Sequence, residues 1–184
     1  LVQQCRDFSA KPIQASSQFE KLTFLFPGQG AQHPGMARDL YENESVFREA
    51  LDQCAEILEP EIGFSLIDLI VPPEDRLEEM AKTLRDTSLA QPAILSVSYA
   101  LAKRGQHWGI EPDIVVGHSI GEFAAATFAG VFSLPDALRL IAKRGRLMSD
   151  LPGGVMISVR GRRPMDKNHK TGARQKSAHA PKIR

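Results

Sequence analysis

A serine between two glycines is the residue of this chain best placed for nucleophilic chemistry. Residues 114–122 read Ile-Val-Val-Gly-His-Ser-Ile-Gly-Glu, which is an apolar strand, then Gly-X-Ser-X-Gly, then the start of an apolar helix. This order is typical of a nucleophile elbow, in which Gly117 and Gly121 permit a sharp strand-to-helix turn. Ser119 then stands at the helix N-terminus, where free N–H groups and the helix dipole stabilise an oxyanion. The alternative is a glycine-rich turn that carries a surface serine.

A second glycine-rich loop follows another short apolar strand near the start of the chain. Residues 23–26 read Thr-Phe-Leu-Phe, and Pro-Gly-Gln-Gly-Ala-Gln follows at 27–32. In α/β folds, ligands bind at the carboxyl edge of the sheet, which is where such a loop would lie. A backbone N–H of this loop is therefore a candidate second donor to an oxyanion. The alternative is an ordinary turn at the end of a strand.

One arginine occupies an unusual position on a predicted amphipathic helix. The pattern predicts a helix from Pro135 to about Asp150, with Ser133 as its N-cap. At about 100° per residue, Arg144 falls in the middle of the apolar arc, away from the other cations of the helix. Burying an unpaired guanidinium is costly, so Arg144 needs an anionic partner. That partner is a substrate carboxylate or a structural carboxylate, unless the side chain extends to the rim of the helix.

Four motifs, taken together, resemble the acyltransferase domains of polyketide and fatty acid synthases, the malonyl-CoA:acyl carrier protein transacylase family. The motifs are Phe-Pro-Gly-Gln-Gly-Ala-Gln at 26–32, Gln-Pro-Ala at 91–93, Gly-His-Ser-Ile-Gly-Glu at 117–122 and Lys-Arg-Gly-Arg-Leu-Met at 143–148. Their order and spacing match the family from about Leu22 to Val159. Four ordered motifs are far more specific than any one of them.

The resemblance implies a role for five residues. In this family the elbow serine carries the acyl group, which makes Ser119 the expected nucleophile. The residues of the oxyanion hole correspond to Gln29 and Ile120. Arg144 corresponds to the arginine that pairs with the free carboxylate of the extender unit, in agreement with its helical phase. Gln91 corresponds to a glutamine that lines the pocket.

The implied activity is transfer of an acyl group from coenzyme A to the phosphopantetheine thiol of an acyl carrier protein through an acyl-serine. Arg144 favours acyl groups with a free carboxylate, because a guanidinium binds a carboxylate through two hydrogen bonds. Ile120 also resembles the malonyl-type domains. The implied partners are acyl-CoA, an acyl carrier protein and, in a modular enzyme, neighbouring synthase domains on the ketosynthase side. No metal, permanently bound cofactor, nucleic acid or membrane is expected.

The general base of the family is a histidine beyond the arginine motif, and none of the five histidines of this chain lies in a matching motif. A serine hydroxyl without a base is a poor nucleophile. We therefore expect a C-terminally truncated domain that is itself inactive or nearly so. Two other readings stay open: a serine esterase or thioesterase, which shares the elbow but has no need of Arg144, and a non-catalytic fragment.

Composition divides the chain into three predicted segments: a linker-like stretch at 1–21, a partial acyltransferase domain at 22–159 and a tail at 160–184. The tail carries nine Lys or Arg residues and one acidic residue, Asp166. Such a composition buries too little apolar surface to order itself, so we expect a disordered, non-family tail, such as the product of a reading-frame shift. The absence of an apolar run long enough to span a bilayer, together with two isolated cysteines, favours a cytoplasmic location.

The elements that must position these residues alternate between strands and helices. Helices are expected at 35–41, 45–58, 65–70 and 91–103, in addition to those that follow the elbow and Ser133. This alternation predicts an α/β fold with a mainly parallel sheet and flanking helices, as in the α/β-hydrolase-like core of the family. Residues 155–159 resemble the strand that enters the family's ferredoxin-like small subdomain, which we expect to be largely missing.

Overall fold

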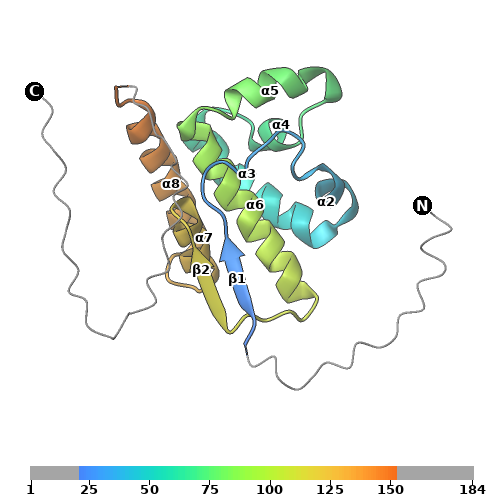
Figure 1. Cartoon of the computed structure of the whole chain (residues 1–184). Coiled ribbons are helices and arrows are strands. Elements are labelled where there is room, and N and C mark those ends of the chain that lie inside the picture. Colours follow the sequence, from blue (N-terminus) through green and yellow to red (C-terminus); the bar gives the residue numbers. More distant parts are fainter. Residues whose placement is uncertain (1–20, 153–184) are drawn as a thin grey trace, which may run out of the picture. The chain divides into compact units, whose positions relative to one another are not determined.

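The computed structural model describes residues 21–152 (Figure 1). These residues form helices beside a small parallel sheet, and no ferredoxin-like subdomain is present among them. The expected strand at 155–159, the basic tail at 160–184 and nearly all of the linker at 1–21 lie outside the described residues. The three predicted segments therefore stay predictions.

Two strands form the sheet within the part of the chain that the structure describes. Strand β1 (Thr23–Phe26) pairs in parallel with β2 (Ile114–Gly117), so that Phe24 lies opposite Val115. The ladder continues past the end of β2, because the His118 N–H donates to the Phe26 carbonyl at 3.1 Å. The carboxyl ends of the two strands therefore lie side by side, and the predicted parallel pairing is confirmed.

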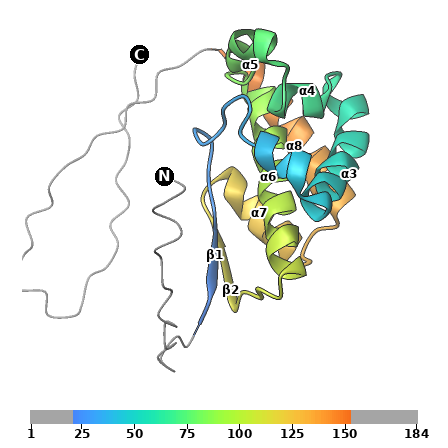
Figure 2. The ribbon, with the colours of Figure 1, turned by 90° about the vertical axis from the view of Figure 1, so that its right-hand side faces the viewer.

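The helices lie on one side of this sheet (Figure 2). They are α2 (Arg38–Asn43), α3 (Ser45–Ile62), α4 (Leu66–Ile70), α5 (Leu77–Thr83), α6 (Thr87–His107), α7 (Ile120–Phe128) and α8 (Leu134–Ser149), with a short 3-10 helix at Glu74–Arg76. Within residues 21–152, no helix combines the length and the apolar character that crossing a membrane requires.

Three helix boundaries differ from the expected ones, each for a local reason. Helix α2 begins after Gly35, whose φ of 77° does not fit a right-handed helix. Helix α3 continues to Ile62 and ends at Gly63, which is left-handed with φ of 66°. Helix α6 begins before the Gln-Pro-Ala motif, because the Asp86 side chain accepts a hydrogen bond from the Ser88 N–H at 2.9 Å and caps the helix there.

The core lies where α3 and α8 pack against the central helix α6. Fully buried side chains of these helices include Leu51, Leu95 and Ile141. On α8, the buried positions recur at the spacing of one helical face, as the periodicity predicted, and Ser133 caps this helix by accepting from the Asp136 N–H at 3.2 Å. The packing therefore fixes the rotation of α8 and with it the direction of Arg144.

The two faces of the sheet have different surroundings. Phe24 and Phe26 lie on the face that meets the helices, and both contact the ring of Phe128 on α7, with centroid separations of 5.7 and 6.1 Å. The opposite face carries Leu25 and Val116, which are 76% and 48% exposed. Parallel sheets usually bury both faces. Within residues 21–152, however, this sheet is covered by helices on one face only.

Cys54 provides a test of the core. It lies on the buried face of α3, and burial raises the pKa of its thiol to about 12, against a smaller opposing effect of a hydrogen bond with Ser96. The thiolate is the reactive form, so Cys54 of the native protein should react with a thiol reagent at pH 8 on the order of 1,000-fold more slowly than in the unfolded chain. A Cys5→Ser variant, measured with and without guanidinium, isolates this thiol. Equal rates under the two conditions would show that Cys54 is not held in the core.

Candidate active site

Ser119 stands at a strained turn between β2 and α7. Its φ is 54° and its ψ is −114°, and it is the only non-glycine residue with positive φ among residues 21–152. Such a backbone costs on the order of 1–3 kcal/mol and persists only where the surroundings enforce it. The serine side chain is exposed and does not cap the helix. The turn therefore has the conformation expected of a nucleophile elbow, with its hydroxyl free for chemistry.

The two glycines of the motif are required by close backbone packing. A Cβ on Gly117 would collide with the backbone of Gly121 and Glu122, and a Cβ on Gly121 would collide with the backbone of Phe26. The turn thus folds tightly onto itself and onto the end of β1. The N–H of Ile120, the first residue of α7, belongs to the helix N-terminus and needs no intrahelical acceptor. It is therefore a candidate donor to an oxyanion beside Ser119.

The loop after β1 lies directly against the elbow. A Cβ on Gly28 would sit 3.0 Å from the His118 carbonyl oxygen and would collide with the His118 ring. Gly28 and His118 immediately precede Gln29 and Ser119, so the two backbones meet at the carboxyl edge of the sheet. The structure therefore brings the two predicted glycine-rich segments together.

A close helix contact sets the position of Arg144. The next residue, Gly145, is buried, and a Cβ there would lie 2.9 Å from the Thr87 carbonyl oxygen at the start of α6. The half-buried Arg144 guanidinium donates to the Gln91 side-chain oxygen and lies 5.7 Å from the centroid of the Phe123 ring, within cation–π range. Phe123 comes one helical turn after Ser119 on α7. The arginine is therefore directed toward the helix that begins at the elbow.

No carboxylate within residues 21–152 forms an ion pair with Arg144, whereas other arginines such as Arg104 and Arg139 pair with glutamates. The sequence pattern allows two anionic partners for Arg144, a structural carboxylate and a substrate carboxylate. A structural carboxylate is not found among the described residues. An amide and an aromatic face orient the guanidinium without neutralising it. A cation held in this way can still bind a carboxylate.

Gln91 is fully buried, and it links Arg144 to the loop after β1 that contains Gln29. Its side-chain nitrogen donates to the Thr87 hydroxyl at 2.9 Å, and its oxygen accepts from Arg144. The Thr87 hydroxyl in turn donates to the side-chain oxygen of Gln29 at 2.9 Å. Four residues from three distant segments thus form one hydrogen-bonded series. Sequence reasoning missed Thr87 and Phe123, although a polar residue four positions before a buried glutamine on one helix was a usable signal for Thr87.

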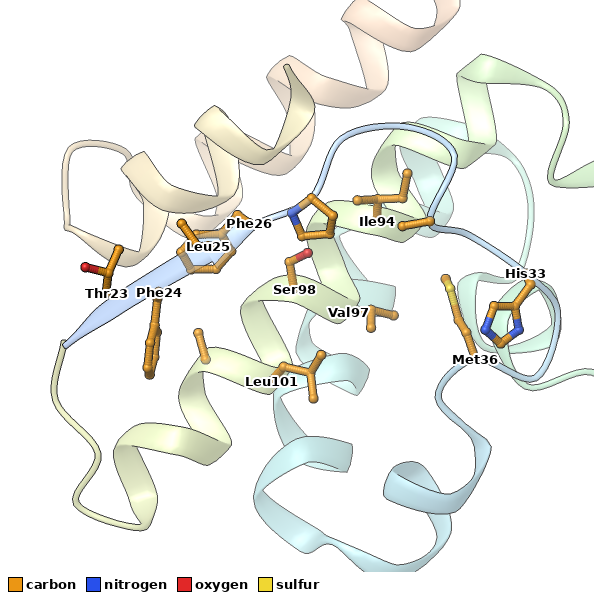
Figure 3. A pocket seen from close by; sticks show the side chains of 13 residues that line it. Thr23, Phe24, Leu25, Phe26, His33, Met36, Ile94, Val97, Ser98 and Leu101 are labelled. Atoms are coloured by element: carbon orange, nitrogen blue, oxygen red, sulfur yellow. The ribbon is translucent and has the colours of Figure 1, made fainter. Parts of the chain in front are cut away.

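A cavity within the described residues has a lining that does not include these residues. It has a volume of about 600 Å³ and lies between β1 and the side chains of α6, including Ile94, Val97 and Leu101 (Figure 3). None of the five predicted site residues lines it. An apolar cavity is often the binding site of a protein. Here the strained Ser119, the two candidate oxyanion donors and Arg144, which has no carboxylate partner within residues 21–152, define the candidate site instead.

Comparison with known proteins assigns the chain to a family. The sequence model of the family described as acyl transferase domain matches residues 23–173. The chain therefore belongs to the acyl transferase domain family, and the predicted resemblance is confirmed. The α/β architecture is confirmed as well, because the acyl transferase domain of ZmaA has a similar structure, with a TM-score of 0.71 and 40% identity over 76% of this chain and 32% of that chain.

Other matches include two large synthases and a further solved structure. A spectinabilin polyketide synthase system protein, NorB of Streptomyces orinoci, is 45% identical over 75% of this chain. The hybrid synthetase acdB of Aspergillus candidus is 42% identical over 84% of this chain. The matched segment spans 6% of the length of each of these two relatives. The solved structure of MCAT from Streptococcus pneumoniae is 39% identical over 71% of this chain and 39% of that chain, with a TM-score of 0.62.

Proposed function

We propose that this acyltransferase domain moves a malonyl-type acyl group from coenzyme A to the phosphopantetheine thiol of an acyl carrier protein. The observation that carries the proposal is the strained backbone of Ser119, which is held between two obligatory glycines at the start of α7. A family of acyl transferases supplies the reaction class. The arginine beside the elbow supplies the preference for a charged acyl group.

The first half-reaction is attack on a thioester. The Ser119 oxygen adds to the carbonyl carbon of acyl-CoA, and the resulting oxyanion accepts hydrogen bonds from the N–H groups of Gln29 and Ile120. The carbon–sulfur bond then breaks, leaving the acyl group as an ester on Ser119, and the hydroxyl proton ends on the sulfur of coenzyme A. The support for this step is the contact between Gly28 and His118, which holds both donors at one edge of the sheet.

The second half-reaction transfers the acyl group from Ser119 to a thiol. The phosphopantetheine sulfur of the carrier protein attacks the acyl-serine, the carbon–oxygen bond to Ser119 breaks, and the thiol proton returns to the serine oxygen. The same two N–H groups stabilise the oxyanion of this second tetrahedral intermediate, so one preorganised hole serves both half-reactions. No redox change occurs, and coenzyme A and the carrier arm are substrates of the transfer. The domain therefore needs no permanently bound cofactor for this exchange.

Substrate preference is assigned to Arg144. A malonyl carboxylate loses hydration on entering the site, and a bidentate hydrogen bond to the guanidinium compensates for that loss. The absence of a carboxylate partner for Arg144 among residues 21–152 supports this role. A neutral acyl group such as acetyl gains nothing from Arg144. We therefore propose a substrate with a free carboxylate, with malonyl-CoA as its simplest form.

Turnover by this chain alone is expected to be slow. Within residues 21–152, no side chain forms a hydrogen bond with the Ser119 hydroxyl, so no general base is in place to take its proton. Oxyanion stabilisation and binding alone still accelerate acyl transfer by roughly 10³- to 10⁴-fold in serine enzymes that lack triad members. Slow loading of Ser119 is thus expected, and it is measurable in single-turnover experiments.

The reaction class is tested by giving the chain malonyl-CoA and a purified, phosphopantetheinylated acyl carrier protein. The expected result is malonyl-carrier protein above the level formed without the chain, detected by intact-protein mass spectrometry. Release of free malonate with no malonyl-carrier protein would instead favour a thioesterase. Absence of both products would favour a non-catalytic fragment. Comparison of the two products thus separates the three functions.

A further inference from the structure

We propose that Thr87 is a positioning residue that joins the oxyanion loop to the arginine of the acyl site. This inference rests on the function proposed above, and it assigns a role to a residue outside the four motifs. Thr87 is the first residue of α6, and its hydroxyl lies between the side chains of Gln29 and Gln91. Through them it reaches both the loop that offers an oxyanion donor and the guanidinium that selects the acyl group.

The direction of each hydrogen bond follows from the chemistry of the partners. The Thr87 hydroxyl has one proton, which it donates to the Gln29 oxygen, so it meets the Gln91 nitrogen with a lone pair. With its nitrogen held by Thr87, the Gln91 amide presents its oxygen to Arg144. A hydroxyl is the only side-chain group of this size that can both donate and accept here. The Gln91 nitrogen also donates to the Met148 sulfur at 3.4 Å, but the hydroxyl at position 87 is the nearer and stronger acceptor and therefore contributes most to the way the Gln91 amide is turned.

The backbone of Thr87 is itself held from two sides, which makes it a fixed point. Asp86 caps the start of α6 and also accepts from the Ser149 hydroxyl at 2.9 Å, which ties the end of α8 to this turn. Gly145 brings α8 against the Thr87 carbonyl. The elements that carry Thr87 and Arg144 thus cannot separate without breaking these contacts.

Gln29 has much less support of its own. It is exposed, and it lies in a loop that contains Gly30, whose φ is 116°. A second attachment of this loop is the bond from the Gln32 side chain to the Leu84 carbonyl at 3.3 Å. The shorter bond from Thr87 is therefore expected to limit the motion of Gln29 and of the N–H that it offers to the oxyanion.

We call the hydrogen-bonded series of Gln29, Thr87, Gln91 and Arg144 the relay. The variant Thr87→Val keeps the shape of the side chain and removes the hydroxyl, and the relay predicts separate effects on the maximal rate and on the half-saturating concentration. Loss of loop restraint should lower the maximal rate of Ser119 loading from both malonyl-CoA and acetyl-CoA by about 3- to 10-fold. Loss of the Gln91 orientation should raise the half-saturating concentration of malonyl-CoA but not that of acetyl-CoA. Thr87→Ser, which restores the hydroxyl, should return both values toward those of the natural chain.

The experiment measures single-turnover loading by intact-protein mass spectrometry, and it is paired with NMR of the same variants. In Thr87→Val, the side-chain amide of the buried Gln91 should exchange with water about 3- to 10-fold faster, and the backbone of Gln29 should have a lower order parameter. Thr83→Val is the matched control, because the Thr83 hydroxyl donates to the Glu79 carbonyl outside the relay, at 3.0 Å. It should change none of these values.

The two readouts separate failure of the relay from failure of the proposed function. If the natural chain loads neither acyl group, the proposed function fails for this chain, and the NMR changes decide the relay alone. If Thr87→Val leaves the exchange of Gln91 and the order of Gln29 unchanged, the relay is wrong whatever the loading rates are. If Thr87→Ser behaves like Thr87→Val, the hydroxyl is not the reason for the effect, and the proposal is overturned.

Discussion

Ser119→Ala is expected to abolish acyl loading of this chain from malonyl-CoA. The covalent intermediate requires the serine oxygen, and alanine offers no atom at which the ester can form. Fold and backbone should survive, because alanine is only one oxygen smaller and the Ser119 side chain does not cap α7. Incubation with excess malonyl-CoA, followed by intact-protein mass spectrometry, should show no protein that carries a malonyl group. The natural chain supplies the positive sample.

The control for this variant is thermal unfolding, and the Tm of Ser119→Ala should equal that of the natural chain. A stable variant that still gains a malonyl group at the natural rate would show that another nucleophile accepts the acyl group. The strained turn would then need a structural explanation. Loss of labelling together with a large loss of Tm would call for Ser119→Gly as a second variant, because glycine adopts positive φ without strain.

Arg144→Ala is expected to change acyl preference more than it changes the fold. A charge-assisted bidentate pair with a carboxylate contributes on the order of 1.5–3 kcal/mol, so the ratio of malonyl to acetyl loading should fall by about 10- to 150-fold. Loading with acetyl-CoA itself should change little, since acetyl has no carboxylate. The measurement is the pair of single-turnover rate constants, determined in parallel for the two thioesters.

Arg146→Ala provides the matched control for this substitution. Arg146 lies on the same helix and is exposed, and its guanidinium donates to the Glu61 carbonyl on α3 rather than toward the elbow. It should leave the malonyl to acetyl ratio unchanged. If Arg144→Ala also leaves that ratio unchanged, the carboxylate pairing is wrong, and an esterase-like function without a charged substrate gains support.

The elbow could be predicted from the sequence because its chemistry is local. A strand, two glycines around a serine and a helix lie within nine consecutive residues, and steric conflict at Gly117 and Gly121 leaves few other ways to fold them. The side of α8 on which Arg144 lies was predictable for a similar reason, since helical phase places it in the middle of the apolar arc of this helix. Short-range geometry is sufficient for both residues.

The connection between these residues could not be predicted, because it depends on packing between distant segments. Gln29 and Thr87 are 58 residues apart, and Gln91 and Arg144 are 53 residues apart. The packing of α8 on α6, with the close approach of Gly145 to the start of α6, brings the second pair together. The sequence pattern also began α6 too late, at the Gln-Pro-Ala motif, so that Thr87 fell outside the expected helix. The spacing of Thr87 and Gln91 could be seen in the sequence, but the contacts of Thr87 with Gln29 and of Gln91 with Arg144 depend on the fold.

The central claim is that Ser119 is an acyl-accepting nucleophile, and peptide mapping tests it most directly. The natural chain is incubated with malonyl-CoA, digested, and the fragments are sequenced by tandem mass spectrometry. We predict one malonyl ester, located on Ser119 of the peptide that contains Gly-His-Ser-Ile-Gly. A malonyl group found only on other residues, or a chain that stays unmodified after prolonged incubation, would contradict the claim.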